Sequence, residues 1–314
     1  VSVVMELRTK PADNLYFTAF RFGVSRVLGQ PEIDAAVAAA TRCDKALVFV
    51  GRSGEWDTEG SDLENIDLPR NQNALIDAVC AANPNTIIIL QTGGPVEMPW
   101  VQRVPAIMQS WYPGQECGNA IADVVFGDAD PGGRLPQTFP TRWRDNPSHS
   151  QDPQIYPGSE GTVRYGEGVY IGYRHYEKHG IVPLFPFGHG LSYTDFSLTD
   201  LTVESDENDV HVTVTVKNIG SRTGSTVVQL YLADDDPEIE RPIKELRGFA
   251  KVTLNASETE TLTLTLKSRD FAYFDVNTAC WRVAGGEYTL LLGFSSTDII
   301  LTLKLTQTAC TIPL

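Results

Sequence analysis

Short continuous apolar runs alternate with helical patterns in the first part of the chain. An alanine-rich stretch at residues 31–43 predicts a helix, and the apolar run at 45–51 predicts a buried strand of the parallel type. The alternation continues with a helix at 70–82, strands at 86–91 and 106–111, and a helix at 115–126. Elements of these lengths in this order predict an α/β sandwich built on a doubly wound sheet.

The hydrophobic pattern changes to a period of two after residue 196. Alternating segments occur at 210–216, 227–233, 259–266, 287–293 and 299–305. Short strands at this spacing predict an all-β sandwich. The Gly-, Pro- and aromatic-rich stretch at 127–193 has few periodic segments and is expected to run over the surface. We therefore expect an α/β domain at 29–192 and a β-sandwich domain at 193–314.

Two strand-like stretches, at residues 1–7 and 16–24, precede the first predicted helix. Two strands alone are marginal in water, so they need partners from another segment. No signal peptide and no initiator methionine open the sequence. We expect the chain to begin in mid-protein, with residues 1–28 as the end of another β-rich unit.

Composition narrows the class of protein. The 314 residues are 42% hydrophobic and 21% charged, and no apolar run approaches the roughly 20 residues that span a bilayer. We expect a soluble chain with no membrane partner. The formal net charge of -15 would repel phosphate backbones, which makes nucleic acid a poor partner and favours a neutral substrate.

The five cysteines show neither CxxC nor zinc-ligand spacing, so no metal site is expected. Residues 51–54 do not make a GxGxxG motif, which disfavours dinucleotide binding, and no cofactor is expected. Cys280 and Cys310 flank the last strand-like segments and are candidates for a disulfide. Asn255 begins an N-glycosylation acceptor tripeptide, and together these features favour secretion. The alternative stays open, because such tripeptides occur by chance and an odd cysteine count fits a disulfide framework poorly.

An acidic loop follows the predicted strand that ends at Gly51. It places five carboxylates within ten residues, 55–64, next to glycines and Trp56. Ligands bind outside the carboxyl ends of strands in open α/β sheets, which makes this loop a candidate site. The competing interpretation is a solvated acidic surface loop.

Residues 54–69 resemble the acid/base loop of glycoside hydrolase family 3, which commonly reads Glu-Gly-Tyr-Asp-Arg before a Leu-Pro. Further segments resemble the same family in the same order: Asn-Pro-Asn-Thr at 83–86, Thr-Gly-Gly-Pro-Val-Glu at 92–97, Gly-Asn-Ala-Ile-Ala-Asp-Val at 118–124, Gly-Asp to Leu-Pro at 127–136, Tyr-Gly-Glu-Gly at 165–168, Gly-Tyr-Arg at 172–174 and Phe-Pro-Phe-Gly-His-Gly-Leu-Ser-Tyr at 185–193. Residues 241–249 resemble the fibronectin type III-like domain that ends these enzymes.

This resemblance implies the C-terminal portion of a secreted, retaining β-glucosidase. In similar enzymes a TIM barrel supplies an aspartate nucleophile, and a six-stranded α/β sandwich supplies a glutamate acid/base. The expected substrates are β-glucosides or cello-oligosaccharides with terminal β-D-glucosyl residues, as in cellulose degradation. Activity is expected only together with the N-terminal barrel, and an oligomer is possible. Residues 1–28 resemble the end of a protective-antigen-like carbohydrate-binding insert.

Glu59 is the residue that best matches the family's acid/base, because Glu59 to Asp62 align with its Glu-Gly-Tyr-Asp. Glu55 is the second candidate. Ser61 and Leu63 depart from the family's usual Tyr and Arg. A general acid needs a raised pKa, which burial or neighbouring carboxylates would provide.

Two other functions compete with this prediction: a non-catalytic carbohydrate-binding or adhesion protein, and a β-xylosidase or N-acetylglucosaminidase of the same family. The acidic, glycine-flanked loop at a strand end favours an enzyme over a pure binding protein. Five aromatic side chains have the right chemistry to stack on sugars, but core or loop positions are commoner for such residues, and none is assigned: Trp56, Trp100, Trp111, Tyr165 and Tyr173. A structural role is expected for His189.

Overall fold

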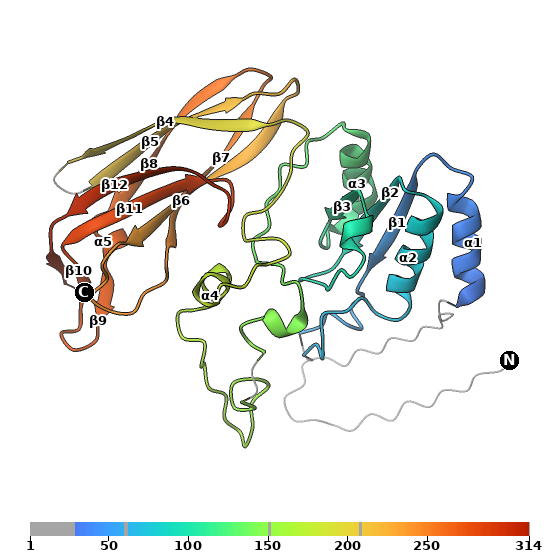
Figure 1. The fold of residues 1–314 in the computed structure, drawn as a ribbon, viewed down its shortest axis with the longest axis horizontal. Helices are drawn as coiled ribbons and strands as arrows, with labels where there is room; N and C mark the ends of the chain where they lie inside the picture. Colours follow the sequence, from blue (N-terminus) through green and yellow to red (C-terminus); the bar gives the residue numbers. More distant parts are fainter. Residues whose placement is uncertain (1–28, 60–61, 150–151, 207–208, 314) are drawn as a thin grey trace.

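The computed structural model describes residues 29–59, 62–149, 152–206 and 209–313. In it an α/β unit and a β-sandwich are joined by a long irregular segment (Figure 1). The predicted strands within residues 1–28, and their pairing with another segment, lie outside the described residues.

The α/β unit contains a parallel three-stranded sheet of order β1-β2-β3. Its elements are α1 (Gln30–Ala40), β1 (Ala46–Gly51), α2 (Gln72–Ala82), β2 (Thr86–Gln91), η1 (Val101–Arg103), β3 (Ala106–Gln109), η2 (Gly114–Glu116) and α3 (Cys117–Phe126). Each strand is an almost continuous apolar run, as expected for strands with helices on their faces.

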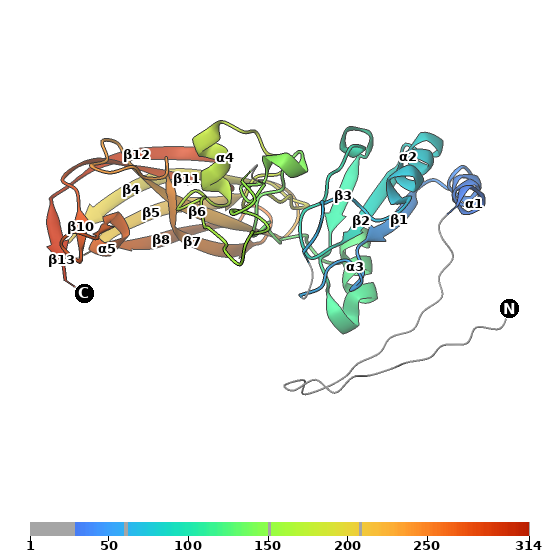
Figure 2. The same cartoon turned by 90° about the horizontal axis from the view of Figure 1, so that it is seen from below.

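Helices lie on both faces of this sheet (Figure 2). Val50 and Leu90 pack with Ile76 of α2 in one buried cluster. On the opposite face, Gln91 donates a hydrogen bond to the Cys117 sulfur at the start of α3, at 3.1 Å. The prediction of a doubly wound α/β arrangement is therefore confirmed. Phe49 of β1 is 54% exposed, so α3 does not cover the whole of its face.

The β-sandwich is entirely antiparallel. One sheet has the order β4-β5-β8, with β4 (Phe196–Ser205), β5 (Asp209–Asn218) and β8 (Thr259–Lys267). The facing sheet has the order β12-β11-β6-β7, with β6 (Gly224–Asp234), β7 (Glu245–Leu254), β11 (Gly286–Gly293) and β12 (Ile299–Gln307). Val212, Val214, Leu230 and Leu290 are buried between these sheets, which confirms the predicted all-β sandwich.

A small third sheet of order β13-β10-β9 lies beside the sandwich and corrects the expected disulfide. It consists of β9 (Tyr273–Asp275), β10 (Cys280–Val283) and β13 (Cys310–Ile312), near the short helix α5 (Ser268–Phe271). Cys310 on β13 lies opposite Val283 on β10, and Val283 is three residues further along β10 than Cys280. Neither cysteine is in a disulfide. Three residues of strand span about 10 Å, beyond the roughly 7 Å that separates bridged Cα atoms. The predicted Cys280–Cys310 bond is wrong.

The segment between the two units is less irregular than its composition predicted. It contains the 3₁₀ turn η3 (Trp143–Asp145) and the helix α4 (Tyr173–His179). The seven residues of α4, Tyr-Arg-His-Tyr-Glu-Lys-His, are too few and too polar to show an apolar helical period, and only Tyr176 is buried. His189 stacks on Phe185, consistent with a structural role.

Asp130, in the segment after α3, ties that segment to the sandwich. Its Oδ1 accepts hydrogen bonds from the Ser192 hydroxyl at 2.6 Å and the Tyr193 amide at 2.9 Å. Its Oδ2 accepts one from the Ser225 amide of β6 at 2.8 Å. Burial alone would raise the pKa of Asp130, but these hydrogen bonds outweigh it and hold the pKa below its usual value.

We expect Asp130→Asn to lower the free energy of unfolding by about 2 kcal/mol at neutral pH, because the amide cannot accept from all three donors. A depressed pKa in the folded state stabilises the protein above the unfolded-state pKa, and this contribution disappears as the pH falls through the folded-state value. The difference between wild type and variant should therefore shrink below about pH 4 in denaturant titrations. Asp128→Asn, at an exposed neighbouring carboxylate, is the control. The same pH dependence in both variants would contradict this role for Asp130.

Candidate active site

The acidic loop leaves the sheet at a position that only glycine can occupy. A Cβ atom on Gly51 would lie 2.0 Å from the Gln91 carbonyl oxygen of β2. The Gly51 amide donates to Gln72 Oε1 at 2.7 Å, and Gln72 Nε2 returns a hydrogen bond to the Gly51 oxygen at 2.9 Å. The loop therefore starts from a fixed point at the carboxyl end of β1.

A buried ion pair between Arg52 and Asp57 folds the loop back on itself. The Arg52 side chain is 1% exposed, and its Nε lies 3.1 Å from Asp57 Oδ1, although the N–H is not aligned for a hydrogen bond. Arg52 Nη2 donates to the carbonyl oxygens of Gly94 at 3.3 Å and Pro95 at 3.1 Å. Burial lowers the pKa of Arg52, while Asp57 acts in the opposite direction. The pair thus fixes the loop after β1 to the loop after β2.

The second oxygen of Asp57 connects the same loop to the residues after β3. Asp57 Oδ2 accepts from the Gly93 amide at 2.8 Å and lies 2.6 Å from the Tyr112 hydroxyl, which is also 2.9 Å from the Arg52 carbonyl oxygen. Burial, together with Asp57, raises the pKa of Tyr112 to about 12. The loops from all three strand ends therefore meet at one carboxylate.

We call Asp57 and its contacts the Asp57 anchor. Glu59, the predicted acid/base, lies two residues beyond Asp57 and is exposed to solvent. Glu55, the second candidate, is also exposed, in a turn where the Trp56 amide donates to the Ser53 oxygen at 2.9 Å. Within the described part of the chain neither carboxylate forms an ion pair. Of the loop's described acidic side chains, Asp57 is the one held by Arg52, and the exposed Glu59 follows it two residues later.

The Asp57 anchor was not predicted from the sequence. An arginine directly after an apolar strand is a weak signal for the burial of Arg52, but the loop offers five carboxylates as its partner. Tyr112 and Gly93 had no such signal, because they lie far along the chain from Asp57. Among the aromatic candidates, Trp100 is fully buried and donates to Asn73 Oδ1 at 2.8 Å, which makes it a core residue.

No group of three or more His, Cys, Asp or Glu side chains is placed to hold a metal ion in the ranges that the structure describes. None of the described helices is both long and apolar enough to cross a membrane.

Both units match families of known proteins. The glycosyl hydrolase family 3 C-terminal domain matches residues 2–173, and the fibronectin type III-like domain matches residues 226–296. The beta-glucosidase of Rhizobium radiobacter is 50% identical over 302 residues, which are 95% of this chain and 37% of that protein. Thermostable beta-glucosidase B of Acetivibrio thermocellus is 44% identical over 273 residues, 86% of this chain and 36% of that protein.

A solved structure shares the same fold over most of the chain. The beta-glucosidase from Kluyveromyces marxianus in complex with glucose has a TM-score of 0.87 and 41% identity, and the match covers 92% of this chain and 34% of that one. The chain thus spans a little over a third of the length of these relatives.

Proposed function

Because the chain belongs to glycoside hydrolase family 3, as its motifs predicted, we propose that it is the C-terminal portion of a retaining β-glucosidase and that Glu59 is the general acid/base. The proposed substrates are β-glucosides and cello-oligosaccharides. The names of the relatives favour glucosides over xylosides, and the Kluyveromyces marxianus enzyme was solved with glucose. The observation that carries the proposal is the Asp57 anchor, which holds the loop containing Glu59 at the carboxyl ends of three parallel strands.

In this proposal the chain contributes one of two catalytic carboxylates. Glu59 protonates the leaving glycosidic oxygen while an aspartate from the barrel attacks the anomeric carbon. Glu59 then removes a proton from the water that releases the sugar. The two carboxyl groups of a retaining enzyme lie roughly 5 to 5.5 Å apart, so the exposed side of Glu59 is where the barrel would approach.

The remaining organisation is proposed on the same basis. Residues 1–28 are assigned to the end of a carbohydrate-binding insert, 29–192 to the α/β sandwich domain and 193–314 to the fibronectin type III-like domain. We also propose that the protein is secreted and glycosylated at Asn255, an exposed residue that begins the acceptor tripeptide ending at Ser257.

The chain alone is expected not to hydrolyse 4-nitrophenyl β-glucoside, because it holds only one of the two carboxylates. Adding a separately produced barrel segment should restore release of nitrophenol, whereas a barrel added to the Glu59→Gln chain should restore little turnover of poorly activated glucosides. Nitrophenol release by the rigorously purified chain would refute the proposal that the second catalytic carboxylate comes from the barrel.

A further inference from the structure

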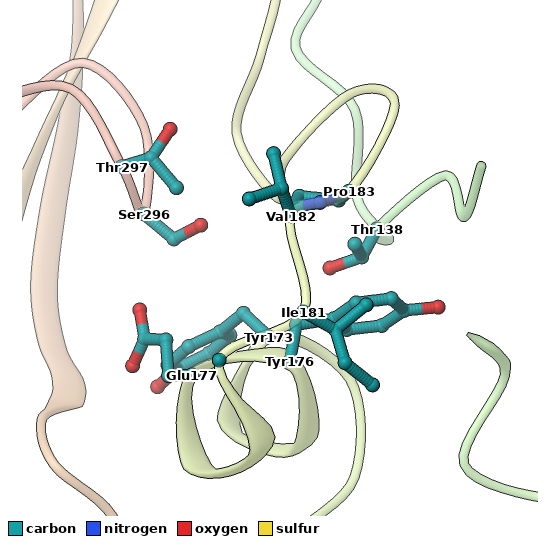
Figure 3. Close-up of a pocket in the computed structure, with 10 residues that line it drawn as sticks. Thr138, Tyr173, Tyr176, Glu177, Ile181, Val182, Pro183, Ser296 and Thr297 are labelled. Atoms are coloured by element: carbon teal, nitrogen blue, oxygen red, sulfur yellow. The ribbon is translucent and has the colours of Figure 1, made fainter.

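A cavity of about 260 Å³ lies between α4 and the loop that follows β11, and none of the residues around Asp57 line it (Figure 3). Most of its wall is apolar or aromatic, formed by Tyr173, Tyr176, Ile181, Val182 and Pro183. Side chains from the segment between the two units line one part, and Ser296 and Thr297 of the sandwich line another. The cavity therefore depends on the contact between this segment and the sandwich.

Two buried oxygens at this cavity lack hydrogen-bond partners among the described residues. They are Thr138 Oγ1, in a residue that is 7% exposed, and Glu177 Oε2. Figure 3 shows Glu177 and Ser296 on one side of the cavity, with the Thr138 hydroxyl directed toward them from the other. A buried polar atom without a partner costs about 1–3 kcal/mol, so such atoms are rare in folded proteins.

The charges around the cavity favour a neutral partner for these oxygens. Glu177 Oε1 already accepts a hydrogen bond from Lys244, which compensates the negative charge. The free Oε2 is thus an acceptor that needs a hydroxyl donor rather than a cation. The Thr138 hydroxyl can both donate and accept, and the apolar walls suit the C–H groups of a ligand.

We propose that this cavity binds a small neutral polyol, either a monosaccharide or an acyclic polyol, with one ligand hydroxyl donating to Glu177 Oε2 and another bonded to Thr138 Oγ1. Water would satisfy the same two oxygens, but it would leave the surrounding apolar wall hydrated. The inference does not depend on the role proposed for Glu59.

Titration of the chain with D-glucose and, separately, with glycerol tests this site. Amide NMR spectra should show saturable shifts around α4 and residues 295–297, with a Kd on the order of millimolar, as expected for so small a ligand. A response to glucose alone would identify a monosaccharide site, and a response to both would identify a general polyol site. No saturable shift around the cavity with either probe would overturn the proposal in favour of water alone.

Thr138→Val should weaken binding about tenfold, equivalent to one lost hydrogen bond of about 1.4 kcal/mol. Thr261→Val, at an exposed threonine of β8, is the matched control and should leave the Kd unchanged. Val182 is 82% exposed at the rim, so Val182→Trp should fold normally and block the cavity even if the Thr138 variant does not fold. Unchanged binding by the Val182 variant, or shifts confined to the loop after β1, would refute the site.

Discussion

Replacing Glu59 by Gln in the complete enzyme is expected to slow the hydrolysis of poorly activated glucosides by more than ~100-fold, since general acid catalysis contributes a factor of 10² to 10⁴. Glucosides with good leaving groups should lose less in the glycosylation step, because their departing oxygen needs less protonation. Deglycosylation should still be slow, because the same side chain activates water. Azide, which needs no general base, should partly restore turnover and yield a β-glucosyl azide. Rates across a series of leaving groups, with and without azide, measure both steps.

Glu55→Gln is the matched control, because Glu55 is also an exposed glutamate of the same loop. It should retain nearly full activity and show no response to azide. If Glu55→Gln instead gave the slow, azide-rescued pattern while Glu59→Gln stayed active, the alignment of the loop with its family would be wrong. If neither variant lost activity, the acid/base would lie outside this loop.

Asp57→Ala is expected to lower the free energy of unfolding by about 3 kcal/mol, because it leaves the Arg52 guanidinium buried without its carboxylate. The Gly93 amide and the Tyr112 hydroxyl lose an acceptor at the same time. In the complete enzyme the untethered loop should also reduce kcat, with the larger loss for poor leaving groups, which depend most on a positioned acid. Denaturant unfolding of the chain and the leaving-group series give the two readouts.

Two further variants separate charge from positioning. Asp57→Asn keeps an oxygen to accept from Gly93 but loses the charge opposite Arg52, so an intermediate loss of stability is expected. Glu55→Ala removes an exposed carboxylate and should change stability by less than about 0.5 kcal/mol. A stable Asp57→Ala protein, with activity equal to that of the Glu55→Ala variant, would show that the anchor does not position the loop.

The elements that the sequence predicted well are those whose burial pattern is simple. Residues 86–91 form β2 as predicted, because the four residues between Thr86 and Gln91 are all apolar and the strand lies in the middle of the sheet. The family was recognisable from motifs in loops, and that prediction is confirmed. β4 was missed because Asp200, at φ +55°, lies in an irregularity between Thr199 and Thr202 that interrupts the alternation.

Contacts between distant segments were beyond the sequence. The partners of Asp57 come from two other strand ends, and nothing in the acidic loop indicates which carboxylate turns inward. The register between β10 and β13 likewise decides which residue lies opposite Cys310. The number of residues between Cys280 and Cys310 does not determine this register. The prediction that Glu59 is catalytic rests on family motifs and remains to be tested by the variants above.

The junction between the segment 127–193 and the sandwich has a consequence for protein engineering. Lys244 pairs with Glu177, the Leu246 amide donates to the Tyr173 hydroxyl at 2.8 Å, and the Ser296 amide donates to the Phe187 oxygen at 2.9 Å. A truncation near residue 193 would remove all three sandwich partners and expose to water the side of the segment that packs on the sandwich. The sandwich is therefore not a detachable module, and chimeras that exchange it between relatives need to carry the segment from 127 to 193 along with it.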